Sequence, residues 1–195
     1  MKNIFKLLLV GLVIGSATVS CTDSELPIDE LYEGVDLTGA FIRTIESPLQ
    51  LVNISDPEKN FIAATIEVQE GQGTSNTFTE VRVYVSTFND QNQAEPTLDA
   101  SGNPLGENLI ATLPASDFEP SEQNQLPSNA FNIPTQLVLD LYPTAVFSLP
   151  TFIFVRLELE LADGRTFTNT NVGPTVATGN YFTAPFSYNI IFLNN

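Results

Sequence analysis

Two carboxylates at alternate positions, Glu158 and Glu160, come nearest in this sequence to an arrangement that could do acid–base chemistry. They belong to the stretch FIFVRLELEL, residues 152–161, in which apolar and polar residues alternate. In an extended strand, residues two apart lie on one face, about 7 Å from each other. Glycoside hydrolysis uses two acids at such a separation. Alternating acids are also the ordinary composition of a solvent-facing strand surface, and we favour that interpretation.

Other catalytic chemistry lacks its usual residues. The sequence has no histidine and a single cysteine. The commonest general base, the histidine-dependent triads and histidine-based zinc or iron sites are therefore excluded. No Walker A, G-x-S-x-G or G-x-G-x-x-G motif is present. We expect no catalytic residue, no metal, no cofactor and hence no enzyme.

Calcium is the one metal alternative, in the segment DASGNPLGE, residues 99–107. Four side chains there offer oxygen atoms: Asp99, Ser101, Asn103 and Glu107. The glycine lies at the wrong position for a calcium loop, and Ile110 stands where the bidentate glutamate belongs. A hairpin turn at Gly102 explains the same residues.

The lone cysteine, Cys21, follows two lysines, an apolar segment over 7–17 and three small or medium residues. This order predicts a secretory signal peptide over residues 1–20. The apolar segment is shorter than the roughly 20 residues that a membrane-spanning helix needs. The last four residues, TVSC, resemble a bacterial lipobox, although Thr18 replaces the usual Leu or Val. The resemblance implies cleavage before Cys21 and a lipid on its sulfur, and no second cysteine is present for a disulfide.

The two acids that follow, Asp23 and Glu25, resemble the export signal that sends many Bacteroidota lipoproteins to the outer face of the outer membrane. We therefore expect surface exposure, with the periplasmic face of the outer membrane as the alternative. Residues 21–36 carry many charges and little apolar periodicity, so we predict a flexible acidic tether. Contact with the membrane is expected through the lipid at Cys21.

The charge of the remaining chain excludes two classes of partner. Without residues 1–20, five Lys and Arg face 23 Asp and Glu, a net charge of −18. Nucleic acid and anionic lipid headgroups are bound through Lys and Arg, and both would be repelled.

Residues 37–195 read as strands separated by loops rich in Gly, Asn, Asp, Ser and Pro. Four alternating stretches have these expected buried positions: Ile62, Ala64, Ile66 and Val68; Val81, Val83 and Val85; Ile153, Val155, Leu157, Leu159 and Leu161; and Phe186, Tyr188, Ile190 and Phe192. They predict an all-β fold, a single immunoglobulin-like antiparallel β-sandwich of about seven to eight strands, with a closed barrel as the alternative. Tryptophan and the cysteine pair of true immunoglobulin domains are absent, so the likeness is architectural. The segment 133–142 predicts one short turn of helix capped by Thr135.

The segment LELELADGRTFTN constrains a hairpin. A three-residue loop ADG places Gly164 in the left-handed region and pairs Leu159 with Phe167 on the buried face. A two-residue loop would shift every partner by one residue and pair Phe167 with Glu160. Burying Phe167 favours the longer loop by roughly 1.5–3 kcal/mol.

Four aromatic residues could stack on sugar rings: Tyr84, Tyr142, Phe154 and Tyr181. They are predicted on outward strand faces or in loops. The alternative for the tyrosines is that each ring is packed and only its hydroxyl meets water.

Four segments of the chain resemble one family: LYEGVDLTGAFIRTI, FTEVRVYVSTFND, VRLELELADGRTFTNTNV and TAPFSYNI. They are similar to small Bacteroidota lipoproteins found alongside SusC/SusD-like outer-membrane uptake systems. The resemblance implies a surface accessory protein of nutrient uptake that binds a glycan or the transporter components. We expect a non-catalytic accessory or interaction module of a glycan uptake system. The alternative is a glycan-binding surface lipoprotein that uses exposed Tyr and Phe residues.

Overall fold

The computed structural model describes residues 39–71, 77–143, 145–172 and 186–194. All of them lie within Leu37–Asn195, which forms one compact unit. The predicted signal peptide, Cys21 and the acids Asp23 and Glu25 lie outside the described residues, as does Tyr181.

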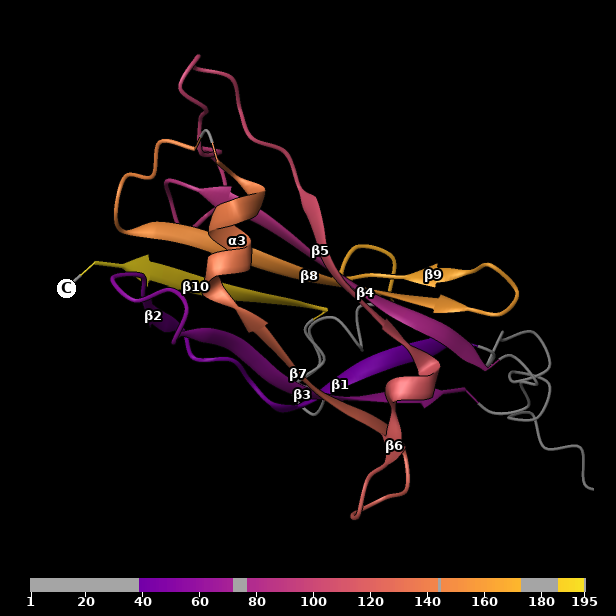
Figure 1. Ribbon diagram of the computed structural model, residues 1–195. Coiled ribbons are helices and arrows are strands. Elements are labelled where there is room, and N and C mark those ends of the chain that lie inside the picture. The colour runs from indigo at the N-terminus through magenta and orange to yellow at the C-terminus, as the bar shows by residue number, and fades with distance from the viewer. Residues whose placement is uncertain (1–38, 72–76, 144, 173–185, 195) are drawn as a thin grey trace, which may run out of the picture. The chain divides into compact units, whose positions relative to one another are not determined.

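The described strands form two separate sheets (Figure 1). The four-stranded sheet has the order β1-β3-β7-β6, with bounds β1 Ala40–Glu46, β3 Phe61–Glu70, β7 Pro127–Pro134 and β6 Glu119–Pro120. The other sheet has the order β2-β10-β8-β4-β5, with bounds β2 Leu51–Asn53, β10 Ser187–Leu193, β8 Thr151–Leu161, β4 Phe78–Phe88 and β5 Asn108–Pro114. A sixth strand of that sheet, β9 (Thr166–Phe167), pairs with β8. Strand pairs are antiparallel except β2 with β10, so the predicted all-β sandwich is confirmed.

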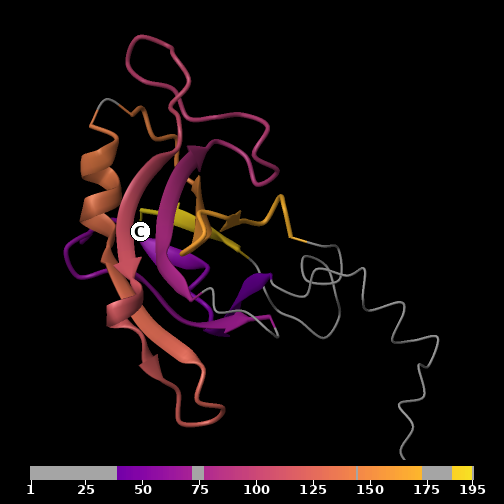
Figure 2. The ribbon, with the colours of Figure 1, turned by 90° about the vertical axis from the view of Figure 1, so that its right-hand side faces the viewer.

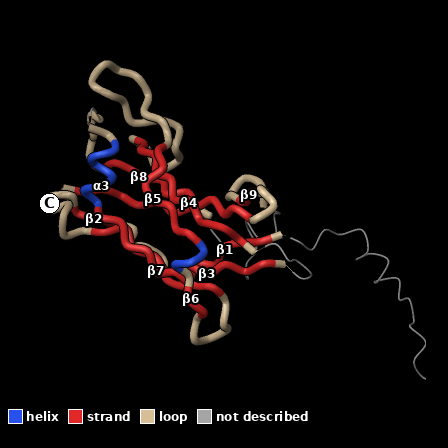
Figure 3. Tube along the Cα trace, turned by 45° about the vertical axis from the view of Figure 1, so that its right-hand side comes forward, coloured by secondary structure: helices blue, strands red, loops and turns tan. Residues whose placement is uncertain are grey.

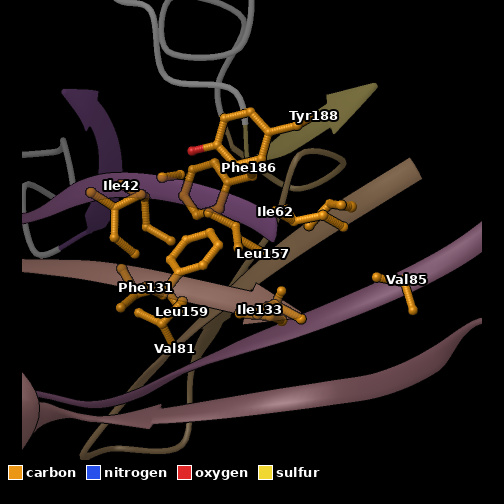
Figure 4. Packing of buried hydrophobic residues seen from close by; sticks show 14 of the residues in the cluster. Ile42, Ile62, Val81, Val85, Phe131, Ile133, Leu157, Leu159, Phe186 and Tyr188 are labelled. Atoms are coloured by element: carbon orange, nitrogen blue, oxygen red, sulfur yellow. The ribbon is translucent and has the colours of Figure 1, made fainter. Parts of the chain in front are cut away.

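The predicted buried faces of the four long strands are confirmed. In β8 every second residue from Thr151 to Leu161 is at most 1% exposed, and the residues between them are half-buried. Figure 4 shows the same alternation in space: side chains of the four-stranded sheet, such as Ile42 and Phe131, meet Leu157 and Leu159 of the six-stranded sheet. The two inner faces therefore form one core, as the period of two requires.

A polar contact also joins the two sheets. The Thr44 side-chain oxygen of β1 lies 2.8 Å from the Tyr188 hydroxyl of β10. Tyr188 is 7% exposed, and burial raises the pKa of its hydroxyl, while the hydrogen bond to Thr44 lowers it. The contact satisfies a polar group within the core, which would otherwise cost free energy.

One helix, α3 (Thr135–Leu141), follows β7 directly and packs against β5 and β7. It continues the layer of the four-stranded sheet, so that it covers the inner face of the six-stranded sheet beyond the end of β7 (Figures 1 and 2). The predicted cap is wrong: Pro134 is the N-cap residue, and no side chain caps the helix. Strand β7 continues to Pro134, whose φ of −57° already suits a helix start, so Thr135 becomes the first helical residue. Its side chain is turned inward and is fully buried.

The β8–β9 hairpin has the predicted register. Leu159 pairs with Phe167 and Glu160 with Thr166, while Gly164 has a φ of +85°. Phe167 is half-buried and packs against the core. The loop is thus the three-residue one, as expected from burial of Phe167.

Two connections extend beyond the sheets. The β4–β5 connection, residues 89–107, reaches away from one end, and the β6–β7 hairpin projects at the other (Figures 2 and 3). A short 3-10 helix, Ala115–Asp117, links β5 to β6. The long strands β4 and β8 lie between these connections. Most of the charged and aromatic residues of the candidate site lie on these two strands.

Candidate functional site

The candidate site is the outer face of the six-stranded sheet, meaning the face turned away from the four-stranded sheet. The inward residues of β4 and β8 fix it: because Val83, Val85 and Val155 are fully buried, their neighbours in sequence must point outward. The pairing of the two strands then sets the rows of this face. Tyr84 lies opposite Arg156, and Arg82 lies opposite Glu158.

Arg82 is the centre of an ion-pair cluster on the outer face. Its guanidinium contacts Glu80 at 2.6 Å, Glu158 at 3.0 Å and also Glu160. Burial lowers the pKa of Arg82, but hydrogen bonds to Glu158 and Glu80 and the charge of Glu160 outweigh it, and the pKa is raised. One cation therefore holds both carboxylates that were considered as an acid–base pair. Both acids lie on the outer strand face, as we favoured from the alternating pattern, and the structure adds that Arg82 pairs with them.

Arg156 extends the cluster toward β5. Its Nε and Nη2 atoms bind the two oxygens of Glu107 at 2.9 and 2.7 Å, and Nη1 lies 3.1 Å from Glu158. The hydrogen bonds to Glu107 raise the pKa of Arg156 and outweigh the lowering by burial. The guanidinium also lies over the Tyr84 ring, 4.3 Å from its centroid. Glu107 and Glu158 are thus joined through one arginine.

The predicted aromatic contacts have different outcomes. Tyr84 and Phe154 lie on the outer face, on neighbouring strands, and both are half-buried. Tyr142 is 3% exposed, so its assignment as a glycan contact is wrong. It follows α3 directly, and its hydroxyl lies 2.6 Å from the Val85 carbonyl oxygen inside the core, which is why it is not available to a ligand. Tyr181 lies outside the described residues.

An apolar row on the outer face was missed by the sequence analysis. Phe88 pairs with Phe152, Phe152 with Ile191, and Ile191 with Leu51. These residues cross four strands on the same side of the sheet; three are half-buried and Leu51 is 59% exposed. The pairing of β2 with β10 spans most of the chain, and no local pattern could reveal it.

The segment considered for calcium forms a hairpin turn. The backbone N–H of Asp99 donates to the Asn103 carbonyl at 2.8 Å, and Gly102 has a φ of +84°. One Asp99 carboxylate oxygen accepts the N–H groups of Ser101 and Asn103, both at 2.8 Å, so it closes the turn itself. Glu107 binds Arg156 instead of joining Asp99. Within the part of the chain that the structure describes, no group of three or more Asp, Glu, His or Cys is placed to hold a metal ion.

Two pockets are present among the described residues, and one of them reaches Leu51 at the end of the apolar row. One opens between the sheets and is lined by Val68, Glu70, Thr77, Phe78, Ala115, Leu126 and Pro127. The other lies beside the β1–β2 connection and is lined by Ser47, Leu49, Leu51, Val52, Lys59, Asn60, Phe61, Ala63 and Asn132. The predicted site residues line neither pocket.

Neither described helix is long and apolar enough to cross a membrane. Comparison with known proteins adds no relative: no family model matches this chain, and no curated protein is similar to it.

Proposed function

We propose that this protein is a non-catalytic lipoprotein of the outer membrane that serves as an accessory or interaction module of a nutrient uptake system. The order of residues around Cys21 supports a lipid anchor, and Asp23 and Glu25 support exposure at the cell surface. The resemblance to lipoproteins that accompany SusC/SusD-like transporters supports the setting.

The observation that carries this proposal is the composition of the outer face. Its central carboxylates, Glu158 and Glu160, are bound by Arg82, whereas several aromatic and aliphatic residues of the face remain for an external contact. Phe152, Phe154 and Leu51 are examples, and Leu51 is more than half exposed. A face of this kind suits binding, because apolar surface gains free energy when a partner covers it.

Co-purification tests the proposal. Tagged full-length protein is isolated from detergent-solubilised outer membranes, and the amounts of SusC/SusD-like components that accompany it are measured by mass spectrometry. We expect these components with the wild type and a reduction of at least tenfold with Phe154→Asp, because a charge is placed in the apolar part of the face.

The matched control is Ala130→Asp, which places the same charge on an exposed residue of β7, in the other sheet and outside the pocket that Leu51 lines. It should leave the co-purified components unchanged. Equal recovery with both variants, or no transporter component with the wild type, would contradict the proposal.

A second candidate function is glycan binding by the protein itself. It is favoured by one observation: Tyr84 and Phe154 lie on the same outer face, where aromatic rings could meet a sugar. Binding of a purified polysaccharide without any protein partner separates this function from the first.

A further inference from the structure

The apolar row of the outer face is a continuous surface. It consists of Phe88, Phe152, Ile191 and Leu51, one residue from each of four adjacent strands. With about 4.8 Å between neighbouring strands, the row is about 14 Å long. Phe154 belongs to the next row and lies on the same face, so that three phenylalanines gather on β4 and β8.

Polar side chains border this apolar surface. Asn189 of β10 lies opposite Phe154 and is exposed. The Gln93 side-chain amide, from the β4–β5 connection, donates to the Asn189 side-chain oxygen at 3.3 Å. Amides beside aromatic rings can hydrogen-bond hydroxyl groups of a ligand whose apolar side covers the rings. Tyr84 is less suited to stacking, because Arg156 lies over its ring.

The charges of the molecule determine which ligands the face can accept. Each of the five Lys and Arg residues after Cys21 has an ion pair: Arg43, Lys59, Arg82, Arg156 and Arg165. They are opposed by 23 Asp and Glu residues. An anionic ligand would meet a negative field and would have to displace a carboxylate from every cation it used. An uncharged ligand would not be repelled by the negative field and would not have to displace a carboxylate.

We propose that the apolar row, together with Phe154 and Asn189, binds an uncharged polysaccharide. The sugar rings lie with their apolar faces on Phe152 and Phe154, and their hydroxyl groups contact Asn189 and Gln93. The inference rests on the second candidate function, glycan binding, and adds its surface and its ligand class: neutral chains and not uronic or sulfated ones.

Affinity electrophoresis of the full-length protein in detergent tests this inference. Native gels contain either a neutral polysaccharide (amylopectin, dextran, galactomannan or xyloglucan) or an acidic one (polygalacturonate, alginate or chondroitin sulfate). We expect retardation by at least one neutral polysaccharide and by none of the acidic ones. Phe154→Ala should weaken the retardation at least tenfold, and so should Asn189→Ala, which removes an exposed side chain and leaves the core intact.

Leu137→Ala is the matched control, because Leu137 is a 41% exposed apolar residue on α3, outside the six-stranded sheet and outside the pocket that Leu51 lines. It should be retarded like the wild type. Retardation by an acidic polysaccharide would overturn the ligand class. Neutral binding that Phe154→Ala and Asn189→Ala leave unchanged would overturn the surface. Retardation by none of the polysaccharides would overturn glycan binding itself. A change of oligomeric mass with Phe154→Ala, measured by light scattering in that case, would identify the row as a contact between copies of the chain.

Discussion

At the scale of single residues, the β8–β9 hairpin depends on one backbone conformation. Gly164 has a φ of +85°, and no atom lies within 4 Å of the position that a Cβ would take. A substitution there is therefore strained by the backbone alone and not by crowding. A substitution at Gly164 therefore measures the free-energy cost of the left-handed backbone conformation without a steric clash of the new side chain.

We expect Gly164→Val to lower the free energy of unfolding by about 1–2 kcal/mol, because a β-branched residue is disfavoured in the left-handed region. Urea unfolding measures the change. Gly106→Val is the control, since Gly106 has equally open surroundings and a φ outside that region. Equal stability of the two variants would contradict the assigned loop.

Tyr142 gives a second test at this scale. Tyr142→Phe removes the hydroxyl that lies 2.6 Å from the Val85 carbonyl oxygen, and at pH 8 we expect a loss of about 0.5–1.5 kcal/mol. Burial raises the pKa of Tyr142 above its unfolded value. The stability that this protonated hydroxyl contributes is therefore complete below about pH 10 and falls as the pH rises further.

The difference between wild type and Tyr142→Phe should accordingly narrow above pH 10, as measured by thermal unfolding at pH 8 and 10.5. Tyr84→Phe, which removes a hydroxyl on the outer face, should change stability by less than about 0.5 kcal/mol. A difference for Tyr142→Phe that stays constant with pH would argue against a buried, hydrogen-bonded hydroxyl.

At the scale of elements, β4 and β8 are joined by charge as well as by their ladder. Arg82 of β4 binds Glu158 and Glu160 of β8 and Glu80 of its own strand. Without the cation, three carboxylates would remain close together on one sheet face. Like charges on neighbouring strands destabilise a sheet.

We expect Arg82→Met to cost about 1–2 kcal/mol in 0.05 M salt, because it removes several hydrogen bonds to charged groups and exposes the three carboxylates to one another. In 1 M salt the Debye length falls to about 3 Å, and the cost should shrink. Lys59→Met, which removes an exposed pair with Asp56, should leave the free energy of unfolding nearly unchanged in both solutions. Urea unfolding at the two salt concentrations measures the free energy of unfolding of each variant. A cost of Arg82→Met that does not change with salt would contradict the role assigned to the ion-pair cluster.

The sequence predicted those elements whose pattern is local. Alternation in β3, β4, β8 and β10 identified the buried faces, because a half-buried strand repeats every two residues. The ADG loop could be chosen because the alternative register would have paired Phe167 with a glutamate.

Other elements had no such local signal. The strands β2 and β6 are three and two residues long, too short for periodicity. The row from Phe88 to Leu51 depends on pairings between distant segments. Tyr142 was wrongly predicted as a glycan contact because its burial depends on how α3 packs. That packing cannot be predicted from composition or residue spacing. The ion-pair partner of Glu158 and Glu160, Arg82, likewise could not be predicted without the register between β4 and β8.

At the scale of the whole molecule, the cations after Cys21 all take part in ion pairs, and the net charge of residues 21–195 is 5 − 23 = −18. Such a charge favours solubility and disfavours contact with anionic surfaces. The proposed lipid at Cys21 would therefore supply the membrane attachment.

The acids next to Cys21 can be tested for a role in export. If Asp23 and Glu25 direct the lipoprotein to the cell surface, their replacement by Ala should lower its accessibility to protease on intact cells, while the total amount of lipoprotein stays similar. Replacing Asp29 and Glu30 by Ala removes the same charge further along the sequence and should leave accessibility unchanged. Equal accessibility of all three proteins would exclude the two acids as the signal.

The measurement that most directly tests a lipid-anchored protein is labelling of Cys21. Cells that make the full-length chain are grown with labelled palmitate and separated into outer-membrane and soluble fractions. We expect the wild type to carry label and to sediment with the outer membrane, and Cys21→Ser to lose both properties, because the chain has no other cysteine. Label and outer-membrane fractionation of Cys21→Ser at the wild-type level would contradict the anchor and, with it, the proposed function.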